Sequence, residues 1–503
     1  NKALMLQVLV TYRLIGEMME KPKFPKRLPN FCEVLFNDTT DDNKIIFYSD
    51  DEPISYAKFK QLVKNFYKYL KDNKITSNDF AMILASDSYM VPVIVMSCFA
   101  MGTKTYCPSP SFTEQNIQRL INKGNFKHIF CDEGGLSKSV HLKNVKVHII
   151  EDIKNYIENN NNDEINFHQF AEEEISLFFN TTGTTGLPKL VPHSMNNVYE
   201  YAKVWGNELR VERDDIIFCI PKICFNYGQG VSLLVNIFKK STAILLRNKP
   251  SPKKIEYVLN KYKPTYFFVV PQIANMMCIR KLNIDLSGVK KFITAGDFLP
   301  ISLTNRIEKL YNKKLLDLIG QAELGGFYTI IDDENYKKGT IGKPMSGVEI
   351  KIDDEGKLFV KTPTNAKEYY MDPDTSKEIF DNGWVMTRDR AHFDHDGYLV
   401  FDGRVHNMLK INSNWVSPIE IEDVILNYKG IDNVLIRPEN DEHDLPMLCA
   451  DIVVSEEISL PNLRAYMRTV LESYKIPKKF LVVESITTTY NGKKIRPVIN
   501  IDN

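Results

Sequence analysis

Residues 180–193 read Asn-Thr-Thr-Gly-Thr-Thr-Gly-Leu-Pro-Lys-Leu-Val-Pro-His, and this stretch, rich in Thr and Gly, is the most informative part of the chain. Gly183 and Gly186 let the backbone bend and bring its N–H groups close to an anion. Lys189 adds a fixed positive charge. Hydroxyl donors are supplied by Thr181, Thr182, Thr184 and Thr185. The apolar residues 177–179 predict a strand that presents the loop, so the stretch predicts a polyphosphate-binding site.

This loop differs from the P-loop of many nucleotide-binding proteins. The P-loop pattern is G-x-x-x-x-G-K-[ST]. Here the two glycines are three residues apart, and Leu190 follows the lysine. A flexible surface loop rich in Thr and Gly is the alternative interpretation. The Pro188-Lys189 pair at this register favours phosphate binding.

The hydrophobic pattern alternates between helices and strands along much of the chain. Residues 55–70 have helical spacing of their apolar side chains, namely Phe59, Leu62, Val63, Phe66 and Leu70. We expect a buried helix that ends at Met101. Strands are predicted at residues 80–85, 103–106, 216–220, 265–270 and 292–295. Strands separated by helices imply βαβ units and largely parallel sheets, which predicts an α/β fold.

The pattern changes after about residue 340. Short alternating strands, separated by Gly and Asp turns, are predicted at residues 348–352, 357–361 and 398–401, and they indicate a small β-rich subdomain. From Gly403 onward the chain has helices of its own, predicted at 418–426 and 462–473, together with strands. We therefore predict two domains, residues 1–402 and 403–503, the second of α+β type.

Charge and composition exclude some classes of partner. The 503 residues include 64 Lys+Arg and 64 Asp+Glu, so the formal net charge is zero. A balanced chain lacks the overall attraction that binders of nucleic acids or anionic membranes usually show. The longest apolar stretch, residues 90–101, is shorter than the roughly 18 residues that a membrane span needs. We expect neither a nucleic-acid partner nor a membrane span.

The eight cysteines are scattered along the chain without C-x-x-C spacing. This distribution favours reduced thiols in a cytoplasmic protein over a disulfide framework or a zinc site.

The loop at residues 181–189 resembles the signature loop of the adenylate-forming superfamily, which includes acyl- and aryl-CoA synthetases, peptide-synthetase adenylation domains and luciferases. Further resemblances follow in the family's order: Gly296-Asp297-Phe298-Leu299-Pro300, Ile319-Gly320-Gln321-Ala322-Glu323, Gly383-Trp384 with Thr387-Arg388-Asp389, Gly403-Arg404 and Asn491-Gly492-Lys493. Because several motifs keep this order over about 300 residues, the chain is identified as a member. The resemblance implies a large N-terminal domain of two α/β lobes plus a β-rich subdomain, and a small mobile C-terminal domain.

The resemblance also implies a role for each motif in binding ATP. The loop with Lys189 would hold the β- and γ-phosphates, and Glu323 would help to bind Mg²⁺. Asp389 would accept hydrogen bonds from the ribose hydroxyls, and Arg404 would lie near ribose or phosphate. Lys493 would reach the α-phosphate and the reacting carboxylate. The remaining expected ATP contacts are Gly296, Asp297, Ile319 and Gly320.

Each of these assignments has a simpler alternative. Glu323 could be a solvated surface charge, Asp389 could cap a turn, and Lys493 could be a surface lysine. His193, which follows the loop, is expected to pack structurally rather than to take part in catalysis.

The chain departs from the family pattern at several positions. Ala322 replaces a Thr near the phosphates, and Arg388 replaces a Gly beside the expected ribose-binding residue. His406 and Asn407 stand where paired Asp residues are usual, and Asn412-Ser413 replace the Ser-Gly pair of the loop that lines the pantetheine tunnel. Adenylation is therefore better supported than CoA transfer. A carrier-protein phosphopantetheine is an alternative acceptor, and a binding-only homologue is an alternative to an enzyme.

The stretch Cys224-Phe225-Asn226-Tyr227-Gly228-Gln229-Gly230 resembles the Phe-Ala-Tyr-Gly-x-Gly segment of benzoate–CoA ligases, with Asn226 in place of Ala. Neutral Asn226 argues against an α-amino acid, whose buried ammonium needs a paired charge. Tyr227 offers a flat wall to an aromatic ring. Gly325 and Gly326 are expected to leave space for a substituent. The alternative is that Asn226 only satisfies backbone groups in a tight turn.

Together these features predict a ligase that uses ATP to adenylate a small aromatic carboxylic acid. The acyl group would then pass to a thiol of CoA or of a carrier protein. A fatty-acid or β-amino-acid ligase is the alternative.

Overall fold

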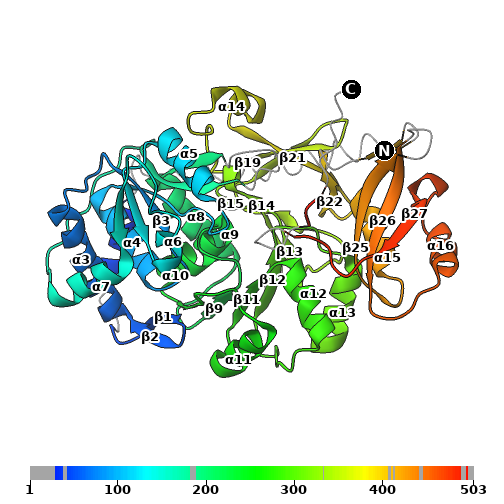
Figure 1. Ribbon diagram of the computed structural model, residues 1–503, viewed down its shortest axis with the longest axis horizontal. Helices are drawn as coiled ribbons and strands as arrows, with labels where there is room; N and C mark the ends of the chain where they lie inside the picture. Colours follow the sequence, from blue (N-terminus) through cyan, green and yellow to red (C-terminus); the bar gives the residue numbers. More distant parts are fainter. Residues whose placement is uncertain are drawn as a thin grey trace.

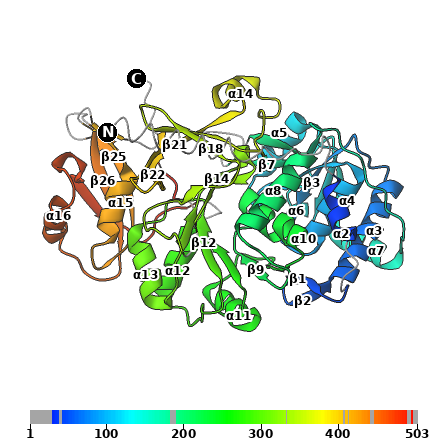
Figure 2. The same ribbon diagram turned by 180° about the vertical axis from the view of Figure 1, so that it is seen from behind.

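The computed structural model describes residues 29–37, 42–181, 189–331, 334–405, 409–411, 414–440, 446–488 and 494–496. In Figure 1 the blue and cyan elements lie on the left, the green elements in the lower centre, the yellow elements at the top, and the orange and red elements on the right. Figure 2 shows the same arrangement from behind. The α/β architecture predicted from the alternation of strands and helices is confirmed.

The first group is built on a six-stranded sheet in the order β6-β5-β3-β4-β7-β8. All neighbouring strands are parallel except β7 and β8, which run antiparallel. The strands are β3 (Phe80–Leu84), β4 (Lys104–Tyr106), β5 (His128–Cys131), β6 (Lys146–Ile149), β7 (Ile175–Asn180) and β8 (Leu190–Ser194). The associated helices are α2 (Phe31–Phe36), α3 (Tyr56–Asp72), α4 (Met90–Met101), α5 (Glu114–Gly124), α6 (Glu133–Leu136), α7 (Ile150–Asn159) and α8 (Met195–Glu208).

Two of these helices follow from their sequences. The side chain of Ser55 caps α3 by accepting a hydrogen bond from the Lys58 N–H, and the apolar positions predicted for this helix are buried. In α4, residues 90–100 are all buried. Pro92 is tolerated because it lies in the first turn, where its missing N–H breaks no helical hydrogen bond. Among the described residues, no helix is long and apolar enough to cross a bilayer.

The second group is built on a seven-stranded sheet in the order β13-β12-β11-β9-β10-β1-β2, parallel except for the β1–β2 pair. Its strands are β1 (Ile45–Ser49), β2 (Glu52–Ser55), β9 (Ile216–Cys219), β10 (Thr242–Leu245), β11 (Tyr266–Val269), β12 (Lys291–Ala295) and β13 (Leu316–Leu318). The helices of this part of the chain are α9 (Asn226–Gly228), the π-helix η1 (Gln229–Val235), α10 (Asn236–Lys239), α11 (Pro252–Tyr262), α12 (Pro271–Arg280) and α13 (Ile301–Tyr311).

The predicted β-rich subdomain is an antiparallel sheet at the top of Figure 1. Its elements are β18 (Glu349–Ile352), β19 (Lys357–Lys361), β20 (Phe380–Asp381), β21 (Trp384–Phe393), β22 (Leu399–Arg404) and α14 (Pro373–Ile379). Short segments precede it: β14 (Gly320–Gln321), the 3₁₀ turn η2 (Ala322–Leu324), β15 (Gly326–Phe327), β16 (Thr329–Ile330) and β17 (Lys343–Pro344).

The C-terminal elements have a hydrophobic cluster of their own. They are β23 (Leu409–Ile411), β24 (Asn414–Val416), α15 (Pro418–Leu426), β25 (Ile431–Asn440), β26 (Pro446–Val454), α16 (Leu460–Arg468), η4 (Ser473–Lys475) and β27 (Lys479–Val482). The helix predicted at 462–473 ends earlier, at Arg468, where the Thr469 hydroxyl bonds back to the Tyr466 carbonyl. The domain boundary predicted after residue 402 falls inside β22, and it stays a prediction.

All eight cysteines are buried and free, in agreement with the predicted reduced thiols. The cytoplasmic location inferred from them stays a prediction.

Candidate active site

The two ends of the predicted phosphate loop are held together by the β7–β8 hairpin. The strand predicted at 177–179 is confirmed as part of β7, and Asn180 pairs with Leu190 across the hairpin. The Thr181 N–H donates to the Lys189 carbonyl at 3.3 Å, and the Lys189 N–H donates to the Thr181 hydroxyl at 3.4 Å. The loop therefore leaves and re-enters the sheet at one point. Thr182, Gly183, Thr184, Thr185 and Gly186 lie outside the described residues.

Glu323 and Lys189, predicted to bind Mg²⁺ and the phosphates during catalysis, both contact Tyr369. The Tyr369 hydroxyl donates to the Glu323 carboxylate at 2.7 Å, and the Lys189 ammonium lies 4.8 Å from the Tyr369 ring centroid. The Ala366 N–H fixes the backbone of Glu323 by donating to its carbonyl at 2.8 Å. Glu323 is therefore held in a network rather than being a freely solvated charge. Sequence reasoning missed Tyr369, which belongs to none of the recognised motifs.

Burial and neighbouring charges set the protonation states around Tyr369. Burial raises the pKa of Tyr369, and the Glu323 carboxylate raises it further, so the tyrosine stays a neutral hydrogen-bond donor. Partial burial lowers the pKa of Lys189, and the charge of Arg388 lowers it further. Arg388 thus adds a second positive charge to the surroundings of Lys189.

Asp389 and Arg404, predicted to contact the ribose, are bonded to each other. They pair across the antiparallel strands β21 and β22, and Arg404 Nε lies 2.8 Å from one carboxylate oxygen of Asp389. Gln321 Nε2 donates to the other oxygen at 2.7 Å. Asp389 is only 1% exposed. The alternative that Asp389 caps a turn is wrong, because the residue lies within a strand and binds these two side chains.

The four remaining residues predicted to contact ATP follow two adjacent parallel strands. Gly296 and Asp297 come after β12, while Ile319 and Gly320 come after β13. Because carboxyl ends of parallel strands meet at one edge of a sheet, these four residues share an edge. Asp317 in β13 was not predicted. Burial raises its pKa, and the charge of Asp297 raises it further.

Asn226 and Tyr227, predicted to bind the acid, are anchored by hydrogen bonds. The Asn226 amide accepts from the Tyr201 hydroxyl at 3.0 Å and donates to the Gln321 carbonyl at 3.2 Å. Asn226 therefore contacts a side chain as well as the backbone, and it remains partly exposed. The Tyr227 hydroxyl donates to the Val269 carbonyl at 3.2 Å, which fixes its ring 5.2 Å from that of Phe327 in an edge-to-face contact.

Gly228 has a structural reason of its own. A Cβ at this position would lie 2.2 Å from the carbonyl oxygen of Lys222, so the turn before η1 admits glycine only.

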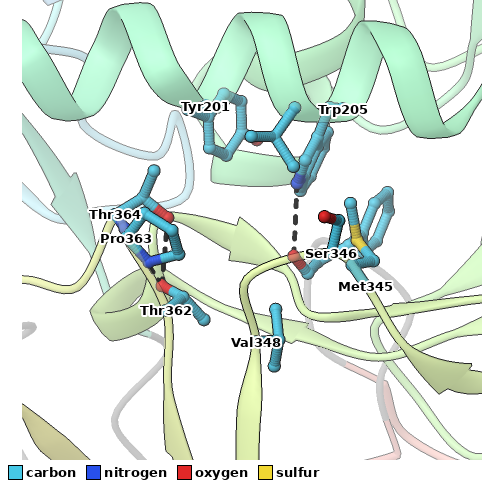
Figure 3. A pocket seen from close by; sticks show the side chains of 10 residues that line it. Tyr201, Trp205, Met345, Ser346, Val348, Thr362, Pro363 and Thr364 are labelled. Carbon is cyan, nitrogen blue, oxygen red and sulfur yellow. Dashed lines mark hydrogen bonds between the residues drawn. The ribbon is translucent and has the colours of Figure 1, made fainter. Parts of the chain in front are cut away.

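The space expected beside Gly325 and Gly326 is filled, so that prediction is wrong. A Cβ on Gly326 would lie 2.0 Å from the Trp205 ring and 2.2 Å from the Tyr201 ring, while a Cβ on Gly325 would lie 2.9 Å from Thr364. Both rings come from α8. Figure 3 shows them above a small pocket that Thr362, Pro363, Thr364, Met345, Ser346 and Val348 also line.

The two rings extend an aromatic stack. Trp205 lies parallel to Phe327 at a centroid distance of 4.0 Å, and its Nε1–H donates to the Phe327 carbonyl at 3.2 Å. Tyr201 lies 4.2 Å from Trp205 on the other side. The missing side chain at Gly326 thus makes room for large rings from a neighbouring helix, and the one at Gly325 makes room for Thr364, so neither leaves space for a ligand.

His193 packs as predicted. Its Nε2 lies 2.8 Å from the Ala322 carbonyl, and burial lowers its pKa to about 4. This contact attaches β8 to the turn that carries Glu323.

Lys493 and the altered residues His406, Asn407, Asn412 and Ser413 lie outside the described residues. The residues that follow Lys493 are anchored. Lys494 and Arg496 both bind Glu422 of α15, at 3.0 and 2.6 Å. Among the described residues, no group of three or more His, Cys, Asp or Glu side chains could hold a metal ion by itself.

More than half of the chain matches one protein family. Residues 36–370 match the family of AMP-binding enzymes. The chain belongs to this family. Membership confirms the resemblance to adenylate-forming enzymes that the order of the motifs predicted.

Two relatives of this AMP-binding enzyme are CoA ligases for different acids. It is 28% identical to a 3-hydroxybenzoate–CoA ligase of Aromatoleum sp. (strain CIB), over 64% of this chain and 65% of the relative. It is also 28% identical to the long-chain-fatty-acid–CoA ligase FadD13 of Mycobacterium tuberculosis (strain CDC 1551 / Oshkosh), over 63% and 66%. The chain thus spans just under two thirds of the length of each.

The fold of this AMP-binding enzyme matches a solved structure over nearly its full length. The crystal structure of the anthranilate CoA ligase AuaEII in complex with anthranoyl-AMP superposes with a TM-score of 0.88, at 20% identity, and covers 95% of this chain and 97% of that one. The predicted fold class is confirmed by this likeness.

Proposed function

We propose that this AMP-binding enzyme uses ATP to adenylate a small aromatic carboxylic acid and then transfers the acyl group to a thiol. One observation carries the proposal. Lys189 and Glu323, more than 130 positions apart in the sequence, converge on Tyr369 at the point where the phosphate loop re-enters the sheet. A cation and a carboxylate so placed suit a magnesium-bound polyphosphate.

The residues around Asp389 fit the sugar of a nucleotide. A carboxylate has about four lone-pair sites. Gln321 donates a hydrogen bond to one oxygen of Asp389 and the Arg404 guanidinium lies beside the other, so the group is an ionised acceptor of the kind that ribose hydroxyls can bind. The same two partners hold the buried carboxylate in one orientation, which supports a binding role over a purely structural one.

The chemistry of Glu323 fits Mg²⁺. Protein-bound Mg²⁺ commonly has one or two carboxylate ligands, with substrate phosphates and waters completing the octahedron. Glu323 offers one carboxylate whose orientation Tyr369 fixes. When bound, the ion would neutralise charge on the phosphates. A single carboxylate suffices in this arrangement because the nucleotide supplies the other ligands.

The reaction would proceed in two displacements. In the first, a carboxylate oxygen of the acid attacks the α-phosphorus. The bond between that phosphorus and the α–β bridging oxygen breaks, and pyrophosphate leaves with this oxygen and the bonding electron pair. In the second, a thiolate sulfur attacks the acyl carbon, and AMP leaves. In the first step Lys189 would stabilise negative charge on the phosphates, and Lys493 would stabilise charge between the acid and the α-phosphate.

The aromatic walls support a small ring as the acid. Tyr227, Phe327 and Trp205 form a continuous set of rings, and Asn226 offers no charge to pair with an ammonium group. Trp205 and Tyr201 close the space that a longer acyl chain would need near Gly326. This closure favours the aromatic acid over a long-chain fatty acid, even though relatives of both kinds exist.

ATP–pyrophosphate exchange with benzoate, hydroxybenzoates, aminobenzoates, fatty acids of increasing length and β-amino acids tests the substrate class. We expect the benzoates to support the fastest exchange. Faster exchange with a long-chain or β-amino acid would contradict the aromatic substrate class but would still support adenylation. ATP binding without exchange for any acid would favour the binding-only alternative.

CoA is the proposed acceptor, because both relatives described above are named as CoA ligases. A carrier-protein phosphopantetheine is the alternative. Mixing preformed acyl-AMP and enzyme with CoA, or with a phosphopantetheinylated carrier protein, separates the two by which thioester forms.

A further inference from the structure

Arg388 has a backbone conformation that side-chain-bearing residues rarely adopt. Its φ is +60°, within strand β21. In this left-handed region the Cβ crowds the following carbonyl oxygen, a cost that glycine avoids. The family pattern noted above has glycine at this position. Strain of this kind persists where the surrounding structure or a function compensates for it.

Arg388 is connected to Tyr369 through the packing of β20 and β21. The Tyr369 ring packs edge-to-face on Phe380 at 5.1 Å, and Phe380 pairs with β21, the strand that carries Arg388. Lys189 lies over the same Tyr369 ring. The charge of Arg388 lowers the pKa of both Lys189 and Tyr369. The direct partner of Arg388 is Glu378 of α14, whose carboxylate lies 3.6 Å from Nη2. That carboxylate is 67% exposed, so the ion pair is weak and competes with water.

Arg388 and Lys189 are therefore two cations near Tyr369, and the charge of Arg388 disfavours the charge of Lys189. A polyanion between them would relieve this repulsion and exchange a weak surface ion pair for charge-assisted hydrogen bonds. Arginine suits such a ligand because its planar fork binds two phosphate oxygens at once.

We propose that Arg388 is a further binding residue for the polyphosphate of ATP, holding with Lys189 the part that leaves as pyrophosphate. The inference rests on the proposed function for its role in catalysis. This chain has Arg388 where the family has glycine. The proposed contact is therefore one that the family motif does not supply.

Calorimetric titration with magnesium pyrophosphate and with magnesium ATP tests the proposal on three variants. Arg388→Gly removes both the charge and the strain. Arg388→Gln removes the charge and keeps the strain, and Arg388→Lys keeps the charge without the fork. We expect Kd for both ligands to rise about tenfold in the first two variants and less in Arg388→Lys.

Lys74→Gly is the matched control. Lys74 is exposed, cationic and also has a positive φ, of 59°, but it precedes β3, at the amino ends of the strands, opposite the site. Arg388→Gly and Lys74→Gly should both gain thermal stability, and only the former should lose pyrophosphate affinity. Affinity within twofold of wild type in both Arg388→Gly and Arg388→Gln, or equal loss in Lys74→Gly, would overturn the proposal.

The two proposals fail separately. If the wild-type protein exchanges no pyrophosphate with any acid, the proposed function is wrong, yet the titrations still decide the role of Arg388. If exchange occurs, Arg388→Gly should raise KM for ATP while leaving kcat within about threefold of the wild-type value. This result is expected when a contact stabilises the ground state and the transition state equally.

Discussion

The hydroxyl of Tyr369 donates a hydrogen bond of 2.7 Å to the carboxylate of Glu323. The ring of the same tyrosine lies under the ammonium of Lys189, at 4.8 Å. One buried side chain therefore orients the proposed metal ligand and one of the proposed phosphate-binding cations. This relationship makes Tyr369 the residue whose substitution should best separate the two roles.

Tyr369→Phe should lower the rate of adenylation about tenfold, because a hydrogen bond to a charged group contributes roughly 1.5–3 kcal/mol. The ring and its contact with Lys189 remain, so ATP affinity should change less than the rate. Initial rates of ATP–pyrophosphate exchange measure the effect. Tyr370→Phe, at the adjacent position, is the control and should behave as wild type. Equal losses in the two variants would contradict the role given to Tyr369.

Asp389→Asn should weaken nucleotide binding and folding together. The substitution leaves the Arg404 guanidinium without its carboxylate, and since that side chain is 44% exposed, we expect a loss of about 1–2 kcal/mol rather than the 3–5 kcal/mol of a fully buried pair. Urea unfolding with and without ATP measures both effects. In a double-mutant cycle with Arg404→Gln, non-additive losses are expected. Strict additivity would show that the contact carries no coupling energy.

Gly326→Ala should destabilise the fold, because the new Cβ would lie 2.0 Å from the Trp205 ring. Trp205→Ala alone should cost about 3–5 kcal/mol. The double variant should lose less than the sum, since the smaller residue at 205 makes room for the methyl group. Thermal unfolding of the three proteins measures this coupling.

If folded, Trp205→Ala should also accept larger acids than wild type in the exchange assay. An unchanged order of acid preference would show that the aromatic stack does not limit the acid.

His193 should make the protein less stable in mild acid. Burial holds its pKa at about 4, below the ordinary value of 6.5. The unfolded chain therefore binds a proton at this residue between pH 6.5 and 4 that the folded protein does not bind. The stabilisation is complete above pH 6.5 and is lost as the pH falls through this window, by up to about 3 kcal/mol.

The contribution of His193 is isolated by a variant, because burial raises the pKa of Asp317 and so acts in the opposite sense. Urea unfolding at pH 7.5 and 4.5 should show a smaller loss of stability in His193→Gln than in wild type. His395→Gln, at a side chain that is 85% exposed, should keep the wild-type difference. An identical pH dependence in all three proteins would contradict the assignment.

The sequence was informative where a residue type is tied to a local pattern. Lys189, Glu323, Asp389 and Arg404 could be selected because each belongs to a short motif, and α3 because its apolar side chains recur at helical spacing. The order of the motifs along the chain also predicted the fold class.

Contacts between distant segments could not be predicted in this way. Tyr369 lies 46 positions from Glu323 and in no motif, so only the folded chain brings it to the site. Gly326 shows the converse. The missing side chain predicts open space, but α8, far away in the sequence, places Trp205 and Tyr201 there. Packing between elements, rather than local pattern, decides both cases.

The nucleotide products formed from ATP, magnesium and benzoate, resolved by mass spectrometry before and after the addition of CoA, test the central claim most directly. If the acid is adenylated, benzoyl-AMP and pyrophosphate should form first, and benzoyl-CoA and AMP should follow. Lys189→Ala should form benzoyl-AMP far more slowly. Formation of ADP and phosphate in place of AMP and pyrophosphate, or no acyl-AMP from any carboxylic acid, would contradict the claim.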